Sequence, residues 1–168
     1  MEQLEFDQET LEKLAKATHE VYCEDLRAKG YRRTLKTDDN NLEHSSLRPF
    51  NQLSEDKKEQ NRNFAKDIPN KLGYAGFTIV LARRDIVTDQ LCYEQVEILA
   101  KMEHEHWMKK KLESGWKYNQ KTDPDRKLHK ALVPWEELSE EDKEKDRTLV
   151  KNIPRILSIA KYVMVKVK

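Results

Sequence analysis

The amino-acid sequence predicts a mainly α-helical protein with short β-strands, built from two copies of one unit of about 85 residues. The chain matches itself when it is shifted by about 85 positions, and each copy contains segments in which apolar residues recur at helical spacing. Each copy is expected to hold two helices, a long loop and one short strand. Because there are only two copies, we expect a pair related by pseudo-two-fold symmetry.

The internal repeat runs without a gap from Leu11 to Leu72 in the first copy. About 22 of roughly 62 positions are identical, whereas chance gives about one in fifteen, so a duplication is the only explanation. The boundaries follow from this match, with the first repeat at residues 1–82 and the second at residues 83–168. Matching residues include His19 with His104, Gly30 with Gly115, His44 with His129, and Ser54 with Ser139.

Composition restricts the classes of function. The chain has 32 Lys and Arg against 31 Asp and Glu, and this balance argues against binding to a nucleic-acid polymer. Two cysteines, Cys23 and Cys92, are too few and too far apart for a disulfide framework or a zinc site. The acidic N-terminus lacks the apolar core of a signal peptide, and no apolar run is long enough to span a bilayer. We therefore expect a cytoplasmic protein that needs no membrane and no cofactor.

The first segment of each copy is predicted to be a helix. Apolar residues follow three-four spacing in both copies, and Gly30 and Gly115 fit the position just past a helix C-terminus. About two dozen polar residues come next, and a loop of this length is uncommon unless it is functional or anchored. The aromatic residues predicted to anchor the loops are Tyr31, Phe50, Trp116 and Trp135.

A second helix and a short strand complete each copy. Ser54 and Ser139 are expected to cap the second helix, and Pro69 and Pro154 should interrupt it or start a fresh turn. The stretches 76–80 and 162–167 have strand character. Since a lone strand is unstable, the two are expected to pair with each other or with loop segments.

The second copy carries a specific combination of motifs. Leu99-Ala-Lys-x-x-His104-x-x-Trp107 is followed by Gly115-Trp116-x-Tyr118, and then by Leu132-Val-Pro-Trp135. This pattern resembles the ryanodine-receptor repeat, or RyR domain, over nearly the whole chain. The first copy resembles it more weakly, since Tyr22 stands where the family usually has Trp, and Arg33 stands where the second copy has Tyr118. Nothing resembles the pore of the channels, so ion conduction does not carry over.

The resemblance implies a ligand. In the family, the paired repeat encloses a cleft between its first helices, and in the channels this cleft can hold an adenine nucleotide or aromatic drug-like molecules stacked on the Trp of His-x-x-Trp. By position, the stacking residues here are Tyr22 and Trp107. A basic residue one turn after the second Trp aids phosphate binding in that setting, and Lys111 occupies this place, whereas its counterpart in the first copy is Leu26.

The residues themselves support two interpretations. His104, Trp107 and Lys111 share one helix face, as do His19 and Tyr22, and stacking of a base on an aromatic ring contributes about 1–3 kcal/mol. In the alternative, the aromatic residues are core and the histidines tie down a loop. The predicted ligand-binding residues are thus Tyr22, Trp107, His19, His104 and Lys111.

No catalytic or metal-binding group emerges from the sequence. There is no glycine-rich phosphate loop and no nucleophile motif, and His104 and His106 lie two apart on a helix, so they cannot chelate one ion. We therefore expect a non-enzymatic sensor that binds a nucleotide or similar aromatic anion between the repeats. The alternative is a protein-interaction module that docks a partner through charged helices, for example through Lys143 and Arg147.

Overall fold

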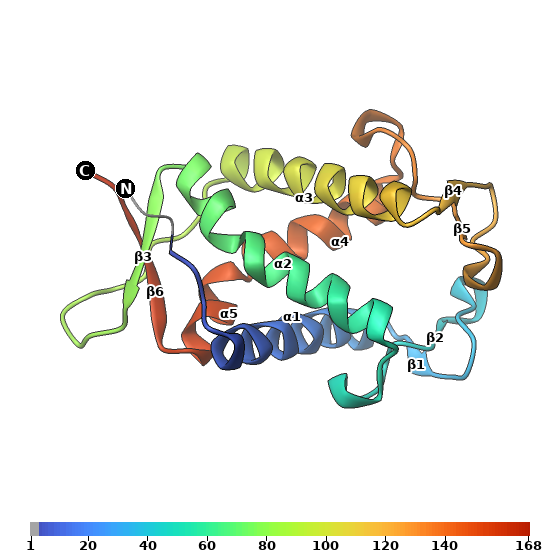
Figure 1. The fold of residues 1–168 in the computed structure, drawn as a ribbon, viewed down its shortest axis with the longest axis horizontal. Helices are drawn as coiled ribbons and strands as arrows, with labels where there is room; N and C mark the ends of the chain where they lie inside the picture. The colour runs from blue at the N-terminus through green and yellow to red at the C-terminus, as the bar shows by residue number, and fades with distance from the viewer. Residues whose placement is uncertain (1–3) are drawn as a thin grey trace. The chain divides into compact units, whose positions relative to one another are not determined.

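The computed structural model describes residues 4–168, which form two compact units. Unit 1 contains residues 4–90 and 151–168, and unit 2 contains residues 91–150. Unit 1 therefore combines the first sequence repeat with the end of the second, so the compact units and the sequence repeats divide the chain differently. The chain is coloured by residue number in Figure 1, so the two parts of unit 1 appear in blue to green and in red.

The predicted first helices are α1 (Gln8–Ala28) and α3 (Tyr93–Glu113). The Asp7 carboxylate caps α1 by accepting a hydrogen bond from the Thr10 backbone N–H at 2.7 Å. Each helix ends two residues before a glycine in the left-handed region, Gly30 with φ 88° and Gly115 with φ 87°. The structure thus confirms the predicted C-terminal ends of both helices.

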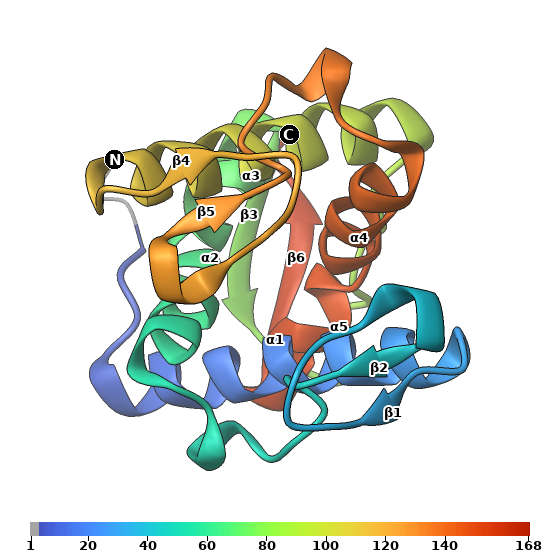
Figure 2. The same ribbon diagram turned by 90° about the vertical axis from the view of Figure 1, so that its right-hand side faces the viewer.

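The long loops contain more regular structure than the sequence predicts. In each loop, two strands of two residues pair in parallel and flank a 3-10 helix, and a second 3-10 helix follows (Figure 2). Such short pairs leave no period in a sequence, which is why the pattern showed only a loop. The elements are β1 (Arg32–Arg33), η1 (Asp39–Asn41), β2 (Glu43–His44) and η2 (Phe50–Gln52), then β4 (Lys117–Tyr118), η3 (Pro124–Arg126), β5 (Leu128–His129) and η4 (Trp135–Glu137).

The second helices differ between the copies. In the first copy α2 (Glu55–Tyr74) continues through Pro69, whereas the second copy is divided into α4 (Glu140–Lys151) and α5 (Ile153–Ile159), with Pro154 in the first turn of α5. The predicted interruption at proline therefore occurs only in the second copy. Both serine caps are confirmed, because Ser54 Oγ accepts from the backbone N–H of Lys57 and Ser139 Oγ accepts from that of Asp142.

The two predicted strands are β3 (Phe77–Leu81) and β6 (Tyr162–Lys166), and they pair with each other in antiparallel register (Figure 1). Helix α2 leads into β3 and α5 leads into β6, so both strands belong to unit 1. On one side of this two-stranded ribbon Phe77 and Met164 are buried, at 2% and 0% exposed, whereas Leu81 at the end of β3 is 64% exposed. Among residues 4–168, no helix has both the length and the apolar character that crossing a membrane requires.

Each unit holds its two long helices together with an arginine network at the same place in the repeat. In unit 1, Arg62 on α2 forms two short contacts to Glu12 on α1, at 2.8 and 3.0 Å. In unit 2, Arg147 on α4 does the same to Glu97 on α3, with both contacts at 2.8 Å. The hydrogen bonds from each arginine hold the pKa of its glutamate below the usual value, so these pairs stay ionised.

Candidate functional site

In unit 2 the predicted stripe on α3 begins with a structural residue, His104. Its side chain is 2% exposed, and its Nε2 lies 2.7 Å from the backbone oxygen of Val133. A carbonyl oxygen can only accept, so Nε2 carries the proton and donates it. His104 therefore ties the loop before Pro134 to the helix, as the loop-anchor interpretation predicts.

Trp107 lies one turn further along α3 and is partly exposed. Its ring centroid is 5.8 Å from that of His104 and 5.0 Å from that of His129, which it meets at 74° in an edge-on arrangement. Two imidazole rings therefore fix the orientation of the indole while part of it still reaches solvent. A held, partly exposed indole suits stacking, because little side-chain freedom would be lost when a planar ligand binds.

His129, from β5, supplies a polar atom beside this indole. Its Nδ1 accepts a hydrogen bond from the backbone N–H of Ala131 at 3.0 Å, so in the neutral ring the proton lies on Nε2. Burial, aided by the charge of Lys111, lowers the pKa of His129 to about 4. At neutral pH His129 therefore offers an N–H donor next to the Trp107 ring.

Lys111 is buried against the aromatic cluster. It is 6% exposed, and its Nζ sits 3.8 Å from the centroid of the Trp116 ring, which is a close cation–π contact. The Trp116 ring in turn lies 6.2 Å from His129. The structure thus places a positive charge within the aromatic cluster, while a role for Lys111 toward phosphate stays a prediction.

Unit 1 has the same histidine–carbonyl contact, but its loop histidine is hydrogen-bonded to a tyrosine. His19 Nε2 donates to the backbone oxygen of Arg48 at 2.7 Å, as His104 does to Val133. His44 accepts from the backbone N–H of Ser46 at its Nδ1, so its Nε2–H donates to the Tyr22 hydroxyl at 3.1 Å. The histidine donor is therefore used internally in this copy.

A comparison with protein-family models matches the RyR domain twice, at residues 3–81 and 84–166. The chain belongs to the RyR domain family. The two matches cover almost the whole chain and confirm the tandem pair that the resemblance indicated. A comparison with curated protein sequences found no match.

Sequence reasoning about this RyR pair missed the role of His44 and His129. Both were visible as an identity between the copies, in a stretch where few positions match. They lie in β2 and β5, the short strands that the sequence did not predict, so nothing in the helical pattern linked them to Tyr22 or Trp107. A histidine retained in both copies of a loop was the available signal.

One close thiol–imidazole pair occurs in the first RyR repeat. Cys23 Sγ lies 3.3 Å from His19 Nε2, and both side chains are 3% exposed. His19 Nε2 already gives its proton to Arg48, so this nitrogen cannot accept one from the thiol. Burial also raises the pKa of Cys23 and lowers that of His19, which keeps both groups neutral.

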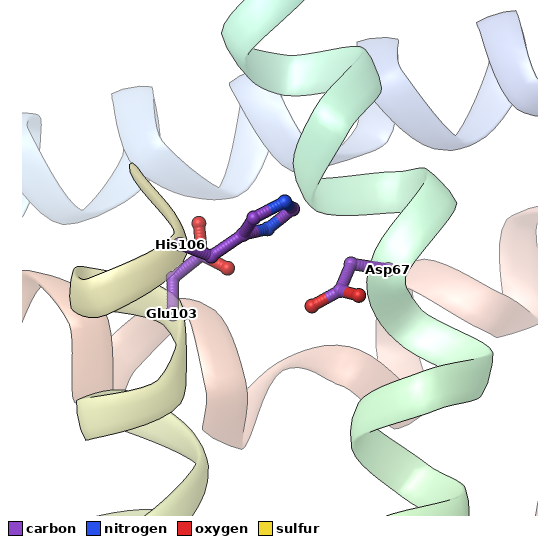
Figure 3. Close-up of side chains that lie close together, drawn as sticks. All are labelled: Asp67, Glu103 and His106. Carbon is purple, nitrogen blue, oxygen red and sulfur yellow. The ribbon is translucent and has the colours of Figure 1, made fainter. Parts of the chain in front are cut away.

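The His104-Glu105-His106 sequence divides between two sides of α3, as its spacing predicts. His104 is bound to the loop, whereas His106 projects from α3 one turn after Glu103 (Figure 3). Figure 3 also draws Asp67, which lies on α2 of unit 1, where one of its carboxylate oxygens is 2.7 Å from Lys71 Nζ. His104 and His106 therefore offer no shared metal site, and the absence of a bound metal stays a prediction.

Proposed function

We propose that this RyR-domain protein is a non-enzymatic binding module whose ligand is a nucleotide or a similar planar aromatic anion. The observation that carries the proposal is the pairing of a partly exposed Trp107 ring with the Nε2–H donor of His129. The ring supplies a stacking surface worth about 1–3 kcal/mol, and the N–H group can donate to an acceptor atom of the base.

The electrostatic surroundings of His129 favour an anion. Burial is the largest cause of its low pKa, and the charges of Lys111, Lys130 and Lys145 act in the same direction, opposed by that of Asp142. The positive charges of Lys111 and Lys130 near His129 favour a phosphate group at this place, although the chain as a whole is almost neutral. A bare aromatic ligand is expected to bind more weakly than one that carries phosphate.

Tyr22 is the second stacking residue that the resemblance assigns. In unit 1 its hydroxyl is held by His44 at 3.1 Å and its ring packs against the buried cluster of Cys23, Leu26, Tyr31 and Leu47. The ring is partly exposed and fixed, as a stacking surface should be. Tyr22 lacks a nearby counterpart of Lys111, since Leu26 takes that place and is 1% exposed. We therefore assign the main contribution to Trp107.

The non-enzymatic part of the proposal rests on the chemistry of the cluster. Its polar groups are a neutral histidine donor and a lysine held against an indole, and neither is placed to act as a nucleophile or a general base. The close thiol–imidazole pair of Cys23 and His19 is buried, and burial keeps both groups neutral. Incubation of the protein with a bound nucleotide should therefore return it unchanged, and turnover would contradict this part.

The test is a titration with a panel of adenine, guanine, cytosine and uracil mono- and triphosphates. Binding should quench tryptophan fluorescence in a saturable way and raise the melting temperature. Trp107→Ala should remove both effects without unfolding the protein, whereas Tyr118→Ala, at a residue 53% exposed, should retain them. If no nucleotide shifts the melting temperature, or if Trp107→Ala binds as well as wild type, the proposal is wrong.

The alternative, a docking module that uses Lys143 and Arg147, gains less support. Their side chains are only 15% and 14% exposed. Arg147 contacts Glu97, Glu140 and Glu144, and Lys143 Nζ lies 5.4 Å from the centroid of the Trp135 ring. Charge reversal here should lower stability before it affects any partner. A partner that loses binding to Lys143→Glu at unchanged melting temperature would revive this alternative.

A further inference from the structure

The ribbon of β3 and β6 has one edge that is covered. Hydrogen-bonded pairs alternate along an antiparallel ladder, and Val167 N–H donates to Gly76 O at 2.9 Å. Met164 and Lys166 therefore direct their backbone groups to the outer edge of β6. There, Met164 O accepts from Asp89 N–H at 2.8 Å, and Lys166 N–H donates to the Asp89 carboxylate at 2.7 Å. The segment after β3 thus closes this edge.

The opposite edge, on β3, is open. The same alternation directs the backbone N–H and C=O groups of Phe77, Ile79 and Leu81 away from β6. Within the described part of the chain, these outward groups have no hydrogen-bond partner. An edge strand of five residues with unpaired backbone groups is a template for another strand.

The sequence of β3 contains none of the features that protect such edges. Phe-Thr-Ile-Val-Leu has no charge, no proline and no glycine, and the Leu81 side chain is 64% exposed. The other strands without a covered edge are two residues long, so they offer little to pair with. A two-stranded ribbon is also marginal by itself, and further strands stabilise it.

We propose that β3 pairs with β3 of a second copy of this chain, antiparallel about a two-fold axis at Ile79. This register places Ile79 opposite its own copy and Phe77 opposite Leu81, so the outward N–H and C=O groups of all three residues are paired. The two ribbons then form one four-stranded sheet. A second copy is the fitting occupant because the edge is complementary to itself: it is uncharged and has three outward-facing residues symmetric about Ile79.

The first test measures the dimer by sedimentation over a wide range of protein concentration. The wild-type chain should pass reversibly from monomer to dimer. Leu81→Pro removes an outward N–H from each copy and leaves the bonds to β6, whereas Leu81→Ala keeps that N–H. The dimer dissociation constant of Leu81→Pro should exceed that of Leu81→Ala by about tenfold or more. A chain that stays monomeric throughout, or equal constants for the two variants, would overturn the proposal.

The second test reads the register and does not depend on a proline. In the proposed dimer Thr78 faces Val80 of the other copy across a narrow pair, with Cα atoms about 4.5 Å apart, which suits a disulfide. Chains with Thr78→Cys are mixed with chains with Val80→Cys, both in a Cys92→Ser background because Cys92 is exposed. The mixed disulfide should form faster than either symmetric one. Equal rates for all three would contradict the register.

Discussion

The two aromatic clusters share one backbone frame but differ in whether the ring on the first helix carries a hydroxyl group. In both units a buried histidine, His19 or His104, donates to a loop carbonyl at 2.7 Å. In unit 1 the Tyr22 hydroxyl accepts the proton of His44, whereas the indole of Trp107 has no oxygen with which to accept from His129. With Trp at the position that Tyr22 occupies in unit 1, the Nε2–H group of the neighbouring histidine has no hydroxyl to which it can donate.

The charge next to the rings differs as well. Leu26 fills its place in unit 1 as an apolar core residue, while Lys111 in unit 2 lies on the Trp116 ring. A lysine that is 6% exposed has lost most of its hydration, and the face of the indole replaces part of it. The two copies thus share the frame, and only the second holds a lysine and a histidine donor beside its aromatic rings.

The largest expected effect tests the shared frame. His19→Ala and His104→Ala each remove a buried ring and leave a loop carbonyl without its donor, so each should lower the free energy of unfolding by about 2–4 kcal/mol. Urea unfolding of both variants measures this, with Tyr118→Ala as the exposed control. A loss below about 1 kcal/mol in either copy would show that the two histidines do not hold equivalent positions.

The next effect concerns pH and separates His129 from the frame. Its pKa is about 4 in the folded protein, against about 6.5 when unfolded, so between these values the unfolded state binds more protons. Stability should therefore fall as pH drops from about 6.5 to 4, by about 2–3 kcal/mol from this residue. Urea unfolding at stepped pH measures the slope, and His129→Gln should flatten it. An unchanged slope in that variant would contradict the assignment.

A smaller effect is expected from removing the hydroxyl that distinguishes the copies. Tyr22→Phe deletes the acceptor for His44 and should cost about 1 kcal/mol. It should also expose the Nε2–H of His44 to exchange with water, so that this copy resembles the second. Histidine side-chain NMR measures the exchange rate. If the His44 proton exchanges equally fast in wild type, the hydrogen bond does not form in solution.

The smallest effect comes from a backbone position at the start of the β3–β6 ribbon. Gly76 takes φ 87° in the first copy, while Lys161 takes φ 61° at the equivalent place. A side chain is strained in the left-handed region, although glycine costs more conformational entropy on folding, so Lys161→Gly should stabilise by about 0.5 kcal/mol. Thermal unfolding should show a slightly higher midpoint. A lower midpoint would mean that Lys161 makes contacts that outweigh its strain.

Local patterns predicted the parts of this fold that local chemistry specifies. Helix ends near Gly30 and Gly115, serine caps at Ser54 and Ser139, and the two strands themselves follow from residue type and spacing, whereas the sequence left open whether the strands pair with each other or with loop segments. The partition into units was not predictable, because nothing in the pattern of α5 says which repeat it contacts. In the structure Arg155 on α5 pairs with a residue of the first repeat, Glu24, at 2.7 and 2.8 Å.

The sequence indicated the residues of the candidate site that lie on α3, but not His129, which lies on β5. The stripe of His104, Trp107 and Lys111 follows from helical spacing, which brings residues three and four apart onto one face. Its partner His129 comes from a two-residue strand, and such an element depends on tertiary contacts, not on a sequence period. The same holds for Lys143 and Arg147, whose charges look available in the sequence but are engaged within unit 2.

The central claim, that the second copy offers a donor beside a stacking ring, is tested most directly by the side-chain NMR signals of the histidines during titration with adenosine monophosphate. The account predicts that the Nε2–H signal of His129 moves with added nucleotide and saturates together with the Trp107 indole signal, while the His44 signal moves less. If the His129 signal stays fixed while the nucleotide binds elsewhere, or if His44 responds more strongly than His129, the claim is contradicted.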